Sequence, residues 1–234
     1  MMKNNIYVNN RHSLYIAGFF LILFLPLLAF TNFFYPPEWA KMIVFRIIFS
    51  SLLCLFLWQI MSKEEFFKEI ALKLKIQKKI IWILLALVIL IILSVIFSSD
   101  ASFSLWASPH RAGGAVNLIF CILFSFALYF ILKDKDWRKL WDFSFAIGII
   151  AVLFAAVQYF DLLPKVFIAY EGRPPGTLSN PILLAIYLII LIFPAISYAI
   201  KEKSKKLIFY WASALFFLFG IFMSGSRAAF LGVI

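Results

Sequence analysis

Long apolar runs are the feature that most constrains how this chain can fold. Runs of about 20 residues recur along the sequence, and each is long enough to cross a hydrocarbon layer of about 30 Å as a helix. Hydrophobic residues make up 65% of the 234 residues, more than a soluble domain of this size can bury while covering itself with polar side chains. The runs also lack the alternation of barrel strands. The sequence therefore predicts an all-α, polytopic transmembrane helical bundle.

The apolar runs predict seven spans followed by the start of an eighth that ends at Ile234. The seven spans cover about residues 13–31, 42–61, 80–97, 115–132, 142–160, 182–200 and 207–223. Because no soluble domain interrupts them, we predict a single transmembrane helical domain over residues 1–234. Cys54 and Cys121 lie inside apolar runs and are predicted to be buried side chains, neither metal ligands nor disulfide partners.

The basic residues predict the orientation of the chain. A net charge of +11 would favour nucleic acid as a partner of a soluble protein, but here Lys and Arg lie in short loops between spans. With a cytoplasmic N-terminus, 16 of them fall on the inner side and five on the outer side. This asymmetry predicts that the N-terminus is cytoplasmic, and no nucleic-acid partner is expected.

The outer cations differ in kind from the inner ones, which are almost all Lys. The five outer cations are Lys41, Arg111, Lys165, Arg173 and Arg227. A guanidinium group is a planar fork that can hold phosphate or carboxylate at two points. Arg46 lies within the second span, deep enough to need a partner or a wet cavity.

Three outer arginines lie next to helix-start signals. In EGRPPGTLSNP, Asn180 and Pro181 form such a signal shortly after Arg173; in SLWASPHRAGG, Ser108 and Pro109 precede Arg111; in SGSRAAF, Ser226 precedes Arg227. A cation at the positive end of a helix is disfavoured unless an anion is present. The set therefore predicts an anion-binding site, although any one arginine could instead snorkel to headgroups or pair with Asp100, Asp161 or Glu171.

Two other features have simpler interpretations. The inner segment 63–79 is amphipathic and is predicted to be a connecting helix at the membrane surface. Pro26 and Pro194 interrupt the first and sixth spans and predict kinks there.

The motifs GRPPGTLSNP before the sixth span, MSGSRAAFLGV after the seventh, and SFSLWASPHRAGG before the fourth resemble hallmark segments of the O-antigen ligase and O-antigen polymerase superfamily. The resemblance implies a metal-independent, cofactor-free glycosyltransferase of the bacterial inner membrane. It would move a glycan from an undecaprenyl diphosphate carrier to lipid A core, another glycan or a protein on the outer face. It also implies that Arg173 and Arg227 grip the carrier diphosphate, with Arg111 a weaker match, and Arg46 is a further candidate.

The resemblance does not identify the catalytic base in this chain. The family takes its base from a histidine on a large outer loop that follows further spans. The chain is therefore expected to be an N-terminal fragment, inactive alone. His110, the outer histidine, is an alternative base, although a loop histidine beside an arginine is more often a surface residue.

Two other classes of function stay open. A transporter or flippase for an anionic lipid or solute would use the same arginines in an outward-facing site. A membrane scaffold would explain the hydrophobicity but not the outer arginines. The sequence lacks a phosphate-cradling GxxxxGK[ST] loop, which argues against ATP-driven transport by this chain alone.

Overall fold

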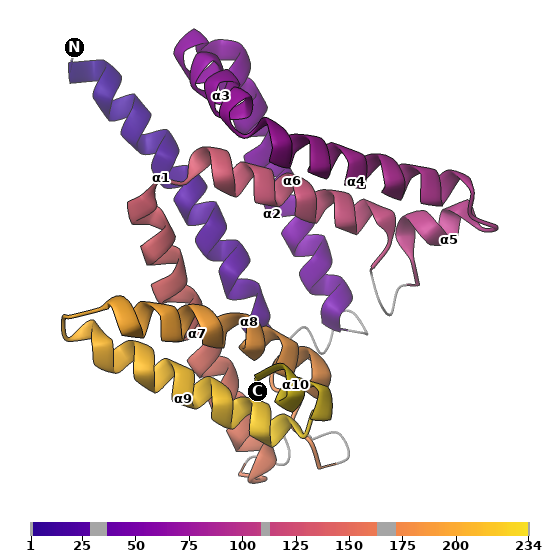
Figure 1. Ribbon diagram of the computed structural model, residues 1–234, viewed down its shortest axis with the longest axis vertical. Coiled ribbons are helices and arrows are strands. Elements are labelled where there is room, and N and C mark those ends of the chain that lie inside the picture. The colour runs from indigo at the N-terminus through magenta and orange to yellow at the C-terminus, as the bar shows by residue number, and fades with distance from the viewer. Residues whose placement is uncertain (1, 29–36, 109–112, 163–171, 234) are drawn as a thin grey trace. The chain divides into compact units, whose positions relative to one another are not determined.

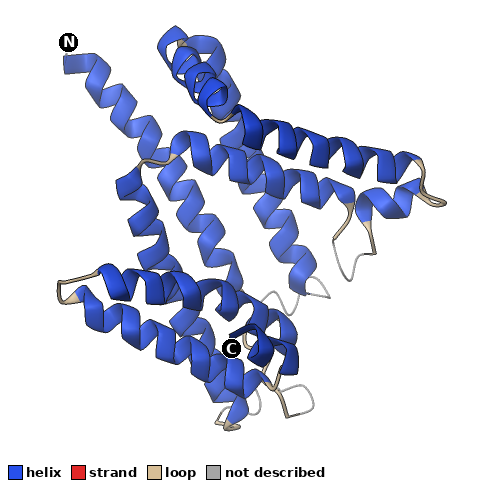
Figure 2. Cartoon of the chain, viewed as in Figure 1, coloured by secondary structure: helices blue, strands red, loops and turns tan. Residues whose placement is uncertain are grey.

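The computed structural model describes residues 2–28, 37–108, 113–162 and 172–233 (Figure 1). Every regular element within these ranges is helical (Figure 2). The elements are α1 (Met2–Phe24), the short 3-10 helix η1 (Leu25–Leu27), α2 (Pro37–Ser62), α3 (Glu64–Ile76), α4 (Lys78–Ile96), α5 (Ala101–Trp106), α6 (Ala115–Ile131), α7 (Asp134–Tyr159), α8 (Pro181–Lys201), α9 (Lys206–Ser224) and α10 (Arg227–Val233). The all-α prediction is therefore confirmed.

Five helices within the described residues are long and apolar enough to cross a membrane. They are Trp39–Ser62, Lys78–Ile96, Asp134–Tyr159, Pro181–Lys201 and Lys206–Ser224. The apolar helices at the predicted first and fourth spans, His12–Leu27 and Ala115–Ile131, are shorter. The chain thus has the composition of a multi-pass membrane protein, and length and hydropathy support five of the seven predicted spans.

The chain divides into two compact units. The N-terminal unit comprises Met1–Ile22 and Phe34–Asp134, and the C-terminal unit comprises Leu23–Phe33 and Lys135–Ile234. The division passes through α1, close to the point where this helix gives way to η1 at Leu25. Pro26 lies within η1, so α1 ends before this proline and does not bend around it, whereas α8 continues through Pro194.

The N-terminal unit is packed largely by aromatic rings. Phe49 of α2 is fully buried and lies 5.9 Å, 6.1 Å and 5.4 Å, between ring centroids, from Phe45, Phe120 and Phe124. Most of these pairs are edge-to-face, the geometry that the ring quadrupole favours. Phe19 of α1 joins the same cluster through Phe124, so aromatic contacts hold α1, α2 and α6 together.

The periphery of the N-terminal unit has few buried side chains. α4 is apolar on all sides and none of its residues is buried, as expected for a helix that faces lipid. α3 confirms the predicted amphipathic helix, with two acidic residues in its first turn and two lysines in its last. Cys54 and Cys121 are free thiols on exposed faces, so the prediction that they are buried is wrong. No helix of the described part of the chain covers those faces of α2 and α6.

The C-terminal unit is packed around small residues. α8 and α9 form a helical hairpin against which α7 and α10 pack (Figure 1). A Cβ atom at Gly220 would lie 2.5 Å from Leu188 Cδ1 and 2.7 Å from Val152 Cγ2, and one at Gly148 would lie 2.6 Å from Leu191 Cδ1. Glycine at these positions lets the helices approach closely, which is the main source of packing between helices in lipid.

A polar network joins one end of α7 to the hairpin. Asp142 accepts a hydrogen bond of 2.7 Å from the Tyr210 hydroxyl and pairs with Lys206, and Arg138 pairs with Glu202. These residues lie at the ends of their helices that were predicted to face the cytoplasm. Charged side chains near span ends can reach water while their stems stay apolar, so the network costs little to place there.

Candidate functional site

The site is built on the turn formed by residues 172–180, here named the proline turn. Its two prolines, Pro174 and Pro175, are buried, and Thr177 is buried as well. Gly176 has φ of +60° and Ser179 has φ of +64°, in the left-handed region that disfavours most side chains. The prolines therefore form the inner face of the turn, and the chain accepts a strained residue at Ser179 before entering α8.

A buried glutamine holds the proline turn to α7. The Gln158 side chain accepts a hydrogen bond of 2.7 Å from the Gly176 amide and donates one of 3.1 Å to the Gly176 carbonyl. Both ends of one side-chain amide are thus used on one residue of the turn. In a mostly apolar environment an unpaired backbone group is costly, so this pair fixes the turn at a defined position on α7.

A second contact holds the turn to η1. The Thr177 hydroxyl donates a hydrogen bond of 2.7 Å to the carbonyl of Pro26. The two residues lie far apart in the sequence but within the same compact unit. The turn therefore has side-chain contacts on two sides before α8 begins.

The start of α8 confirms the predicted helix signal. Asn180 is the N-cap, its side-chain oxygen accepts a hydrogen bond of 2.8 Å from the Ile182 amide, and Pro181 is the first helical residue. Proline loses nothing at this position, because its missing N–H would have no helical partner.

The α9–α10 junction lies beside the proline turn. Gly225 ends α9 with φ of +61°, and the buried Ser224 hydroxyl donates to the Ile221 carbonyl at 2.7 Å. α10 then begins at Arg227, and the Ser226 carbonyl accepts from the Ala229 amide at 3.1 Å. Ser226 therefore directly precedes the helix, as predicted, and Arg227 is exposed in its first turn.

Arg173 connects the proline turn to this junction. A Cβ atom at Gly225 would lie 3.0 Å from Arg173 Cδ and 3.5 Å from its Cγ, so the arginine stem crosses directly over the glycine. Arg173 is half-buried and covers Gly225. Arg227 lies two residues after this glycine in the sequence. The fold thus brings together the two segments that carry Arg173 and Arg227.

Arg46 belongs to the N-terminal unit and is half-buried in α2. Its Cζ atom lies 6.0 Å from the centroid of the Phe120 ring, and its Nε atom is buried without a hydrogen bond among the described residues. The Oδ1 atom of Asn117, one turn from Phe120 on α6, is also buried and unbonded there. Arg46 was predicted to need a partner. Among the described residues its guanidinium group has an aromatic ring as a neighbour, while its Nε atom has no hydrogen bond.

The remaining predicted residues, His110 and Arg111, lie outside the described residues. The predicted helix start at Ser108 and Pro109 is therefore described only in part. α6 itself begins at Ala115 with Gly114 as its N-cap, and a Cβ atom at Gly114 would lie 2.2 Å from the Leu105 carbonyl oxygen. Glycine at 114 is thus required by the close passage of α5. Asp100, considered as a partner for an arginine, caps α5 by accepting from the Phe103 amide at 2.9 Å.

Sequence reasoning missed three residues that shape the site: Gln158, Thr177 and Gly225. Gln158 carried a usable signal, because a glutamine within the apolar run AAVQYF must find hydrogen-bond partners. Gly225 carried another, because a glycine at the end of an apolar helix is the usual left-handed C-cap. Thr177 carried none, since its partner is a backbone carbonyl in a distant part of the chain.

The arrangement presents arginine side chains on a rigid frame. A guanidinium group held by a fixed turn loses less conformational entropy on binding an anion than one on a mobile loop.

Comparisons with protein-family models, with curated proteins and with solved structures find no match to this chain.

Proposed function

We propose that this chain belongs to a membrane glycosyltransferase of the O-antigen ligase type. It moves a glycan from undecaprenyl diphosphate to an acceptor on the outer face of the bacterial inner membrane. The acceptor is lipid A core, a growing glycan or a protein. The proposal includes the seven-span topology with the start of an eighth, a cytoplasmic N-terminus, and one transmembrane domain that contains both compact units.

One observation carries the proposal: the Arg173 stem lies on Gly225, two residues before Arg227. The two motifs that support the family resemblance are separated by the whole of α8 and α9, yet they meet in one place. A ligand diphosphate has two charged groups, and two arginines carried by adjoining segments suit that shape. The sequence-based assignment of Arg111 and Arg46 as further diphosphate contacts stays a prediction.

The chemistry of the transfer fits fixed guanidinium groups. An acceptor oxygen attacks the anomeric carbon of the glycan, the bond from that carbon to the diphosphate oxygen breaks, and undecaprenyl diphosphate leaves with the electron pair. Negative charge grows on the leaving diphosphate in the transition state, so positive groups preorganised around it lower the barrier. A base must take the proton of the acceptor hydroxyl; the resemblance places this base on an outer loop after further spans, and His110 is the alternative within this chain.

The proposal is tested by measuring donor binding to the purified chain in lipid nanodiscs. Undecaprenyl diphosphate is the probe, because binding can be measured whether or not the chain transfers glycan. Arg173→Gln and Arg227→Gln should each weaken binding about tenfold or more, since each removes a charge-assisted hydrogen bond to phosphate. Gly225→Ala keeps both arginines but crowds the Arg173 stem, and it should weaken binding by a smaller factor.

Lys205→Gln is the matched control. It removes one positive charge from an exposed position at the other end of α9 and should leave donor binding unchanged. Equal binding by wild type and both arginine variants would refute the diphosphate site. Movement of a labelled lipid across the bilayer, with no glycan transfer by any form of the protein that binds donor, would instead support the flippase alternative.

A further inference from the structure

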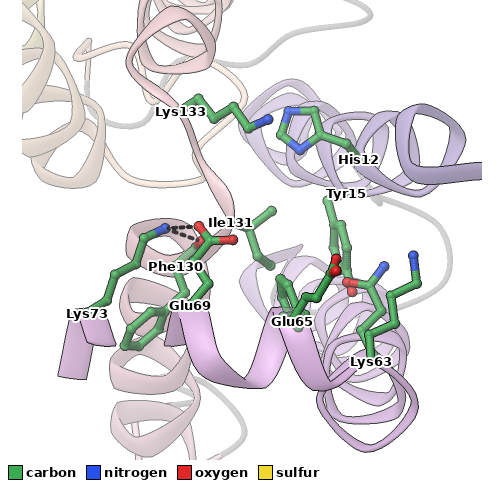
Figure 3. A pocket seen from close by; sticks show the side chains of 11 residues that line it. His12, Tyr15, Lys63, Glu65, Glu69, Lys73, Phe130, Ile131 and Lys133 are labelled. Carbon is green, nitrogen blue, oxygen red and sulfur yellow. Dashed lines mark hydrogen bonds and ion pairs between the residues drawn. The ribbon is translucent and has the colours of Figure 1, made fainter. Parts of the chain in front are cut away.

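A cavity of about 250 Å³ lies in the N-terminal unit (Figure 3). Side chains from α1, α2, α3, the end of α6 and the residues that directly follow α2 and α6 line it. Among the described residues that line it, the charged side chains and the histidine are His12, Lys63, Glu65, Glu69, Lys73 and Lys133. None of these was assigned a role by the sequence, which predicted only that segment 63–79 would be a surface helix.

Two of the charged residues, Lys73 and Glu69, form an ion pair with each other. Lys73 pairs with Glu69 at 3.0 Å and also donates a hydrogen bond of 3.1 Å to the carbonyl of Phe130. Phe130 lies in the last turn of α6, where carbonyl groups lack helical partners and a cation is favoured. Lys73 and Glu69 therefore serve to fasten α3 to the end of α6, and they add no net charge to the cavity.

The other charged residues leave the cavity positive. Among the described residues that line the cavity, the remaining charged side chains are Lys63, Lys133 and Glu65, so this lining has a net charge of +1 with His12 counted as neutral. Lys63 is half-buried and forms no ion pair with another described residue. Figure 3 shows His12 and Lys133 on one side of the cavity and the α3 side chains on the other. The cavity thus suits a ligand with a single negative charge, bound between α3 on one side and His12 and Lys133 on the other.

An apolar groove adjoins the cavity. The groove has a volume of about 80 Å³ and is lined by Leu14, Tyr15, Leu55, Trp58 and Gln59. Tyr15 and Gln59 line the cavity too, so the polar and apolar spaces share a wall. A ligand that fills both would have a charged head joined to a hydrocarbon chain.

The position of α3 agrees with such a ligand. Phe67, Leu74 and Ile76 are exposed large hydrophobic residues on this helix, whereas Ile70 is buried against the unit. Exposed apolar residues beside lysines are typical of a helix that lies in the interface between lipid headgroups and acyl chains. The predicted topology puts this helix in the inner leaflet.

We propose that the cavity binds the phosphodiester of an anionic phospholipid, and that one acyl chain lies along the adjoining groove. A phosphodiester carries one negative charge, which matches the net charge of the cavity. A zwitterionic headgroup would add an ammonium group beside Lys63 and Lys133, so phosphatidylglycerol is favoured over phosphatidylethanolamine. This lipid site is separate from the donor site and does not depend on the proposed transferase activity.

The test uses the purified full chain in nanodiscs that contain both phosphatidylcholine and phosphatidylglycerol. The amounts of the two lipids that stay bound to the protein are compared. Lipids that stay bound after detergent extraction are counted by native mass spectrometry. Wild type should retain phosphatidylglycerol selectively, and Lys63→Gln should lower that selectivity about fivefold, the effect of one lysine near an anionic surface. Lys63→Arg should preserve it, because the charge remains.

Lys68→Gln is the matched control on the same helix. Lys68 pairs with Glu64 and does not line the cavity, and its side chain is 70% exposed. An equal loss in Lys68→Gln and Lys63→Gln would overturn the proposal in favour of general surface charge. Displacement of the bound lipid by millimolar glycerol phosphate would overturn it in favour of a site for free phosphate. Retained helicity by circular dichroism ensures that a loss reports on the site and not on unfolding.

Discussion

The two compact units solve the same packing problem in different ways. The C-terminal unit brings the backbones of α8 and α9 together at Gly220, and its core combines alanine and leucine with an aromatic cluster around Phe145. Among the described helices of the N-terminal unit, no pair packs as closely as α8 and α9; the Phe49 cluster fills the space between α1, α2 and α6, while α4 buries no side chain at all. Close backbone packing gives the C-terminal unit many simultaneous contacts that lipid cannot replace. The N-terminal unit has a more loosely packed periphery that is accessible to lipid.

The difference also separates the two proposed sites. The donor site needs a rigid frame, and it lies on the unit with close packing and buried side-chain hydrogen bonds. The lipid site needs access from the bilayer, and it lies on the unit with exposed helices. Matched substitutions, one in each unit, can test this contrast.

The largest expected effect is that of Gly220→Leu. A Cβ atom there already meets Leu188 and Val152 well inside contact distance, so a leucine side chain must force α9 away from α7 and α8. We expect the free energy of unfolding to fall by about 3 kcal/mol, the upper range for overpacked interiors. Ala86→Leu on α4 adds a similar volume at an exposed position and should change stability little. Thermal unfolding in detergent measures both, and equal losses would contradict the contrast between the units.

Gln158→Leu should have the next largest effect. It keeps the side-chain size but leaves the Gly176 amide and carbonyl without their partner, which costs about 2 kcal/mol. Gln77→Leu in the N-terminal unit is the control, because no hydrogen bond from the Gln77 side chain occurs among the described residues. Limited proteolysis within residues 172–180 should rise in Gln158→Leu alone. Unchanged cleavage would show that the turn is held by other contacts.

Tyr210→Phe should have the smallest effect. It removes the hydrogen bond from the Tyr210 hydroxyl to Asp142, and such bonds between membrane helices contribute about 0.6 kcal/mol. Tyr129→Phe is the matched change in the N-terminal unit, at an exposed hydroxyl, and should be neutral. A loss for Tyr210→Phe as large as that for Gln158→Leu would mean that the polar network, and not the close packing, dominates the C-terminal unit.

The features that could be predicted from the sequence are those that depend only on residues close together in the chain. The Asn180–Pro181 helix start and the helical segment after Lys63 follow from local capping chemistry and periodicity, and both are present. The fourth span, predicted over about residues 115–132, matches α6 (Ala115–Ile131), which begins directly after its N-cap Gly114. The end of the first span was harder, because hydropathy does not show where a helix ends, and Pro26 turns the end of α1 into η1.

The contacts that build the candidate site could not be predicted from local pattern. Arg173 was identified from its residue type and position, but its contact with Gly225 depends on how α8 and α9 fold back on each other. The bond from Thr177 to Pro26 is of the same kind, because its donor and acceptor are brought together only by the tertiary fold. Charge and hydropathy indicate which residues need partners, whereas the fold decides which partners they find.

The paired hydrogen bonds between Gln158 and Gly176 have a mechanical consequence. Because both bonds end on one residue, the turn cannot slide along α7 without breaking the two together, so the turn moves with α7 as one body. A helix as long as α7 adjusts its tilt to the thickness of the surrounding bilayer. The depth at which Arg173 would meet the proposed lipid-borne diphosphate therefore depends on the membrane itself, through a helix that carries neither arginine.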